Sequence, residues 1–269
     1  MPLLDVDGAR VHYAEAGASV PGGGDPLVLL HAFPLHSAMW APQLACLSSG
    51  RRVIAPDLKG FGASDAPDEL SGYTMFDYAE ALAAVLDALG IGRVVLGGLS
   101  MGGYVAFAFL RRHADRVTGL VLADTRAAAD TAEAFGRRTD QQDQVAREGT
   151  TALVEVLLAG LLCDHTKAHR LELVEQVRRL MANPAAGYIG ALEAMKHRPD
   201  ATAELAGIGV PVLVVVGEAD ALSPPAVARE MAGAIPDAAL AVLPDAGHLS
   251  NLEAPGQFNA AVADFLERL

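Results

Sequence analysis

The residue whose setting points most directly to chemistry is a serine between two glycines. Residues Gly98–Gly102 read Gly-Leu-Ser-Met-Gly, between a strand expected at Arg93–Leu96 and a helix expected at Gly103–Arg112. A serine at a sharp strand-to-helix turn needs a strained backbone, and side chains at the glycine positions would collide with neighbouring backbone. The start of the following helix also favours negative charge nearby. We therefore expect Ser100 to be a nucleophile.

A serine hydroxyl is a weak nucleophile at neutral pH and needs a general base. His248 ends the sequence Asp-Ala-Gly-His, just after the last expected strand, Leu240–Leu243. Parallel sheets place their sites in loops at the carboxyl ends of strands. By contrast, His12 lies in the N-terminal hairpin, His113 at the far end of the helix after Ser100, and His165, His169 and His197 in a helical segment. We expect His248 to be the base.

The base needs an acceptor that fixes its tautomer. Asp220 follows the expected strand Val212–Val216, and the chain order Ser, Asp, His is that of the triad in α/β hydrolases. Asp124, at the end of another expected strand, and Glu218 are the alternatives. We favour Asp220.

A tetrahedral intermediate also needs two backbone N–H donors. The N–H of Met101, directly after the nucleophile, is one candidate. The loop His31–Pro34 reads His-Ala-Phe-Pro after another expected strand, and its proline has no N–H to offer. We assign the N–H of Phe33 as the second donor and expect His31 to brace the loop.

Apolar runs indicate the strands that position these residues. Alternation at Leu3–Val6 and Arg10–Ala16, around Asp7-Gly8, predicts an N-terminal hairpin, and Pro21–Asp25 is typical of a flexible connector. Continuous apolar runs favour a parallel sheet covered on both faces. These runs lie at Pro26–Leu30, Arg52–Ala55, Arg93–Leu96, Val117–Leu122, Val212–Val216 and Leu240–Leu243.

Helical patterns between these runs predict a doubly wound, mostly parallel α/β sheet. They lie at Asp77–Leu89, Gly103–Arg112, Pro225–Ala234 and Pro255–Leu269. Between Asp124 and about Ala206 no strand is expected, and helical periodicity occurs at Thr151–Leu162 and Ala168–Met181. We expect residues 1–124 and 207–269 to form the α/β core and residues 125–206 to be an inserted helical cap.

The composition limits the partners. The 269 residues carry a net charge of -13, which repels nucleic acid and anionic membranes. The chain has no apolar run near the length of a membrane helix and no basic N-terminal leader, so we expect a cytoplasmic protein without nucleic-acid or membrane partners. Its oligomeric state is left open.

Cys46 and Cys163 are predicted to be free, buried thiols. No metal-ligand cluster or nucleotide-binding glycine pattern is found, so we expect no metal and no organic cofactor.

Together these motifs resemble the α/β-hydrolase superfamily over nearly the whole chain. His31–Pro34 resembles its His-Gly oxyanion motif, with Ala32 in place of the usual glycine, and Asp57–Asp65 resembles its Asp-x-x-Gly-x-Gly-x-Ser loop. Within the superfamily the chain is most similar to cofactor-free bacterial esterases, enol-lactonases and haloperoxidase-like serine hydrolases with a small helical cap. Epoxide hydrolases and haloalkane dehalogenases of this fold have aspartate where Ser100 stands.

These features predict a serine hydrolase that cleaves a small carboxylic ester or lactone through an acyl-enzyme. The leucine- and valine-rich stretch Thr151–Cys163 favours a substrate with an apolar portion. Acyl transfer and C–C bond hydrolysis use the same machinery and stay open. A non-catalytic small-molecule binder of the same fold is a further alternative.

Overall fold

The computed structural model describes residues 2–6, 8–17, 24–67 and 69–269. In this part of the chain eight strands form one sheet, in the order β1-β2-β4-β3-β5-β6-β7-β8. β1 and β2 are antiparallel to their neighbours, and the strands from β4 to β8 run parallel. The expected α/β class is confirmed. Most of the connector expected at Pro21–Asp25, and Asp7 of the hairpin turn, lie outside the described residues.

The strands occupy the positions that the apolar runs predict, with ends that shift by up to three residues. Side chains on the central strands β3, β4, β5 and β7 are buried throughout, as expected for parallel strands covered on both faces. The bounds are β1 Leu3–Val6, β2 Ala9–Ala16, β3 Leu27–Leu30, β4 Val53–Pro56, β5 Val94–Leu99, β6 Val117–Ala123, β7 Val212–Gly217 and β8 Ala238–Leu243.

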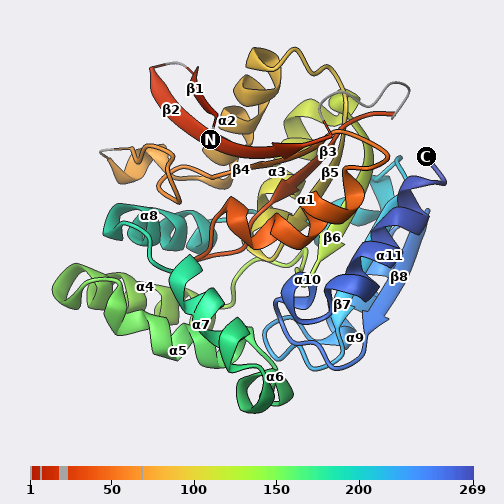
Figure 1. Ribbon diagram of the computed structural model, residues 1–269. Helices are drawn as coiled ribbons and strands as arrows, with labels where there is room; N and C mark the ends of the chain where they lie inside the picture. The colour runs from red at the N-terminus through yellow and green to blue at the C-terminus, as the bar shows by residue number, and fades with distance from the viewer. Residues whose placement is uncertain (1, 7, 18–23, 68) are drawn as a thin grey trace.

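Helices cover both faces of the sheet and create two hydrophobic cores (Figure 1). One core contains side chains of α2 (Met75–Ala88), α3 (Met101–His113) and α9 (Pro225–Ala234). The other contains side chains of α1 (Ala41–Leu47) and α11 (Pro255–Leu266). The short helix α10 (Ser250–Glu253) precedes α11, and 3-10 turns lie at η1 Ser37–Trp40, η2 Leu70–Gly72, η3 Ala114–Arg116 and η4 Thr202–Gly207.

Between β6 and η4 the chain forms helices alone, drawn in green and teal in Figure 1. They are α4 Ala132–Glu148, α5 Thr151–Leu161, α6 Asp164–His169, α7 Leu171–Leu180 and α8 Ala185–Lys196. The sequence patterns did not predict α4, whose buried residues are only Gln142 and Val145. Such a polar helix lacks the apolar stripe that a periodicity argument needs.

The single helix expected at Ala168–Met181 is wrong. The helix is interrupted at Arg170, whose backbone (φ -124°, ψ 57°) is not helical and separates α6 from α7. The Arg170 guanidinium donates to the carbonyl of Glu253 at 2.5 Å, a tertiary contact that accompanies the break. The two cysteines are free as expected, but Cys46 is exposed rather than buried. None of the described helices is long and apolar enough to cross a bilayer.

Candidate active site

Ser100 forms the whole connection between β5 and α3. Its backbone has φ 55° and ψ -113°, a strained conformation for a residue with a side chain. Its N–H donates to the carbonyl of Ala123 at 2.9 Å, and its own carbonyl accepts from Thr125 Oγ1 at 2.8 Å. The last residue of β6 and the segment after it therefore hold this strained turn in place.

The expected boundaries of the turn need correction. β5 continues to Leu99, not Leu96, because Gly98 pairs with both Leu30 and Leu122 in the sheet. α3 starts at Met101, not Gly103. A Cβ on Gly98 would overlap the backbone of Gly102, and one on Gly102 would overlap the carbonyl of Leu30. The glycines are needed because strand and helix approach so closely here.

His248 and Asp220 form a buried pair. His248 Nδ1 donates to Asp220 Oδ2 at 2.9 Å, while Asp220 Oδ1 accepts from the N–H groups of Leu222 and Ser223 at 2.8 and 2.9 Å. Burial opposes ionisation of Asp220, but His248 and these N–H groups outweigh it and hold the pKa of the carboxyl below its ordinary value. An ionised carboxylate can only accept, so the proton of neutral His248 lies on Nδ1 and Nε2 is available as a base.

The two alternative acids, Asp124 and Glu218, have other surroundings. Asp124 is buried and accepts from the N–H of Gly217 at 2.8 Å, and its other oxygen bonds the hydroxyl of Ser250. Burial, together with the negative charge of Asp220, raises the pKa of Asp124 well above its ordinary value. Glu218 is exposed. Within the described residues neither side chain hydrogen-bonds to His248.

A buried glutamate that the sequence analysis missed supports the histidine loop. Glu253 accepts from the N–H of Gly247 at 2.8 Å and from the N–H of Cys163 at 2.9 Å. One carboxylate therefore joins the residue before His248 to the junction of α5 and α6. No sequence signal distinguishes this glutamate from a surface residue, because its partners are backbone groups from two distant loops.

The loop after β3 is braced by a buried histidine. His31 Nε2 accepts from the N–H of Leu58 at 2.9 Å, and Nδ1 lies 3.0 Å from the carbonyl of Ala32, to which it donates. Burial lowers the pKa of His31 to about 4, so the ring is neutral at ordinary pH. The N–H of a trans peptide points opposite to its carbonyl, so the N–H of Phe33 points away from His31.

The two expected oxyanion donors are both free of protein acceptors. Met101 is the first residue of α3, and N–H groups in a first helical turn have no partner within the helix. Within the described residues the backbone N–H groups of Phe33 and Met101 donate to no other group. Both are therefore available to an oxygen atom at the nucleophile.

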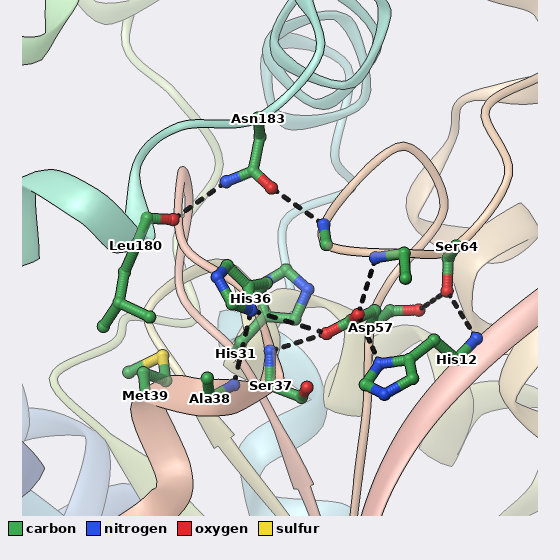
Figure 2. A network of polar contacts seen from close by, with 12 residues as sticks. His12, His31, His36, Ser37, Ala38, Met39, Asp57, Ser64, Leu180 and Asn183 are labelled. Carbon is green, nitrogen blue, oxygen red and sulfur yellow. Dashed lines mark hydrogen bonds and ion pairs between the residues drawn. The ribbon is translucent and has the colours of Figure 1, made fainter. Parts of the chain in front are cut away.

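Figure 2 shows how neighbouring segments contact the loop after β3. Asp57 accepts from His12 Nδ1 at 2.6 Å and from the N–H groups of Ser37 and Ala63 at 2.7 and 2.9 Å. Asn183, from the helical segment, donates to the carbonyl of Pro34 at 2.9 Å. The loop is thus tied to the N-terminal hairpin and to the helices.

Asn183 also contacts the segment that follows Asp57. Its side-chain carbonyl accepts from the N–H of Gly62 at 2.7 Å, and its amide donates to the carbonyl of Leu180 at 2.9 Å. Figure 2 shows the Asn183 side chain with a dashed line to the carbonyl of Leu180. A single buried amide therefore fixes three backbone groups around the site.

Ser100 and His248 line the same cavity, whose volume is about 560 Å³. Helices of the segment between β6 and η4 supply much of its wall, from α4, α5 and α8. Its apolar lining consists mainly of Phe33, Tyr104, Val156, Leu157, Leu161, Met195 and Leu222. Within the described residues no group of three or more His, Cys, Asp or Glu side chains is placed to hold a metal ion.

Comparisons with known proteins find similar sequences and structures over almost the whole chain. Over 250 residues the chain is 28% identical to the 3-oxoadipate enol-lactonase 1 of Acinetobacter baylyi, covering 93% of this chain and 91% of the relative. The solved structure of a thermophilic esterase from Thermogutta terrifontis, with malate bound, has a TM-score of 0.94 and 38% identity. That match covers 100% of this chain and 99% of the esterase.

A second solved structure, the enol-lactonase from Burkholderia xenovorans, has a TM-score of 0.90 and 33% identity, and covers 99% of this chain and 100% of that protein. The family model described as "alpha/beta hydrolase fold" matches residues 25–255. Since this match spans most of the chain, the protein belongs to the α/β-hydrolase family.

Proposed function

We propose that this protein is a serine hydrolase that cleaves a carboxylic ester or lactone through an acyl-enzyme intermediate. The observation that supports this most is the hydrogen bond of 2.9 Å between the buried side chains of His248 and Asp220, together with the cavity that His248 and Ser100 both line. A neutral histidine with its proton on Nδ1 leaves Nε2 free to accept the proton of the serine hydroxyl, as nucleophilic acyl transfer requires.

Each step then has a residue to perform it. Ser100 Oγ attacks the substrate carbonyl while His248 Nε2 takes the hydroxyl proton. The N–H groups of Phe33 and Met101 hold the oxygen that becomes negative. The bond to the leaving alcohol breaks as His248 returns the proton to its oxygen. Water, deprotonated by His248, attacks the acyl-enzyme and releases the acid and the free serine.

We assign residues 125–206 as a cap over the core formed by residues 1–124 and 207–269. Leu157 and Leu161 of α5 line the cavity beside Ser100, so the cap contributes directly to its wall. These side chains suit an apolar portion of a small-molecule substrate. The esterase and enol-lactonase similar to this chain are named for the same two bond types.

Labelling with a fluorophosphonate tests the proposal directly. The wild-type protein should react covalently at Ser100, and a panel of p-nitrophenyl esters, lactones and amides should contain substrates. A folded protein that resists the label and cleaves no member of the panel would be a binder rather than an enzyme. Adding competing alcohols separates hydrolysis from acyl transfer, because a transferase forms new esters in their presence.

A further inference from the structure

The cavity shared by Ser100 and His248 is positively charged, although the whole chain carries a net charge of -13. Arg126, Arg137 and Arg138 line it, and Asp130 is the one acidic residue among the described residues that line it. Arginines that gather around a site on an acidic protein run against the overall charge of the chain. This arrangement indicates a role toward something that enters the cavity.

Two of these arginines already have acidic partners. Arg138 Nε donates to Asp130 at 2.5 Å, and Arg198 pairs with the other oxygen of Asp130 at 2.6 Å. Arg137 pairs with Glu133 at 2.5 Å on the exposed side of α4. Arg198 also lies over the ring of Tyr104, 4.1 Å from its centroid. Both oxygens of Asp130 therefore pair with Arg138 and Arg198, and Arg137 pairs with Glu133. The third lining arginine has no carboxylate partner among the described residues.

That third arginine is Arg126. Arg126 is half-buried, and its buried Nε has no hydrogen-bond partner among the described residues. Within the same residues no ion pair involves its guanidinium. Buried polar groups in proteins are nearly always hydrogen-bonded, because an unpaired one costs its full desolvation. Arg126 directly follows Thr125, whose hydroxyl donates to the carbonyl of Ser100 at 2.8 Å. The unpaired guanidinium therefore belongs to the segment that contacts the nucleophile.

We propose that Arg126 binds a carboxylate of the substrate, and that the natural substrate is an ester or lactone with a second, ionised carboxyl group. The inference rests on the proposed function and adds a substrate class to it. A guanidinium and a carboxylate form two parallel N–H···O bonds, which fix orientation as well as add affinity. Val156, Leu157 and Leu222 provide the apolar surface for the remaining carbon chain.

Matched ester pairs test this subsite. Monoethyl adipate and ethyl hexanoate differ only by a carboxylate in place of a methyl group on the acyl side. 5-Acetoxypentanoate and pentyl acetate differ in the same way on the alcohol side. The wild-type enzyme should favour the acidic member of at least one pair, by about tenfold or more in kcat/KM. Arg126→Gln should reduce that acidic-to-neutral ratio by about 10- to 100-fold, as expected for a lost hydrogen-bonded charge pair.

Arg147→Gln is the matched control, since Arg147 lies on α4, is exposed, and does not line the cavity. It makes the same change in net charge and should leave the ratio at its wild-type value. Arg126→Lys keeps the positive charge but cannot form the two parallel hydrogen bonds of a guanidinium, so it should retain only part of the preference. Loss of the ratio in Arg147→Gln as well would mean that net charge, not a site, sets the preference.

Binding without turnover separates this inference from the proposed function. In calorimetry with the Ser100→Ala variant, glutarate should bind, and adding Arg126→Gln should weaken its binding at least tenfold. If neutral esters are cleaved but no acidic member is preferred and glutarate does not bind, the subsite is wrong and the hydrolase stands. If glutarate binds through Arg126 but no ester is cleaved, the subsite stands and the hydrolase is wrong.

Discussion

Asp220 Oδ2 lies 2.9 Å from His248 Nδ1, although the two residues lie on separate loops after β7 and β8. Only 3% of each residue is exposed. A backbone bond from the N–H of Ala219 to the carbonyl of Ala246, 2.9 Å long, joins the same two loops. The pair is therefore positioned by the ends of two adjacent parallel strands and not by the side chains alone.

Asp220→Asn should lower kcat by roughly 10⁴-fold, as in the serine-protease precedent, because an amide no longer fixes the tautomer of His248. Asp124→Asn should cost far less, since Asp124 hydrogen-bonds to the N–H of Gly217 and the hydroxyl of Ser250 and not, within the described residues, to His248. Steady-state hydrolysis of one p-nitrophenyl ester by both variants provides the comparison. A greater loss in the Asp124 variant would reverse the assignment of the acid.

The buried His31 makes stability depend on pH. Burial lowers the pKa of His31 from 6.5 to about 4. Between these two pH values the unfolded chain binds a proton at His31 that the folded protein does not bind. Stability from this group is complete above pH 6.5 and is lost as the pH falls toward 4. The loss between pH 7.5 and pH 4.5 is on the order of 2–3 kcal/mol.

Urea unfolding of the wild type and of His31→Gln isolates this contribution, because the titrating carboxylates are common to both proteins. The wild type should be the more stable at pH 7.5, and its advantage should shrink at pH 4.5. A difference between the two proteins that stays constant over this range would contradict the neutral, buried state of His31.

Cap residues in the cavity should select among acyl chains. Leu157→Ala or Leu161→Ala enlarges the cavity beside Ser100 and should change the ranking of p-nitrophenyl esters from acetate to decanoate. Hydrolysis of the acetate should change least, since its acyl group is too short to reach these side chains. Equal slowing of every ester would instead assign both leucines to the stability of the cap.

Chelation should leave ester hydrolysis unchanged, because every step of the proposed mechanism is carried by Ser100, His248, Asp220 and backbone N–H groups. Incubation with EDTA followed by assay checks this. Loss of activity that added Zn²⁺ or Mn²⁺ restores would show that a metal ion takes part.

The parallel part of the sheet was predictable from sequence because its strands are largely continuous apolar runs, and β3 and β7 match these runs to within one residue. The pairing of Asp220 with His248 followed from chain order and the ends of two strands. The role of Glu253 was not predictable, since its carboxylate contacts backbone groups brought together only by folding. α4 escaped detection because its surface is almost wholly polar.

Other expectations concern properties that the fold does not determine. The cytoplasmic location and the exclusion of nucleic-acid and membrane partners rest on composition and stay predictions. The fate of the acyl group, passed to water or to another acceptor, depends on which molecule enters the cavity after the first step. Product analysis addresses that choice.

The central claim is that Ser100 is the nucleophile, and the Ser100→Ala variant tests it most directly. Ester hydrolysis should fall to below about one thousandth of the wild-type kcat, because a higher rate would exceed what an oxyanion hole and binding alone sustain. Fluorophosphonate labelling should disappear, and the thermal midpoint should stay within about 4 °C because no packed group is removed. A folded variant that keeps more than this thousandth, or still accepts the label, would contradict the account.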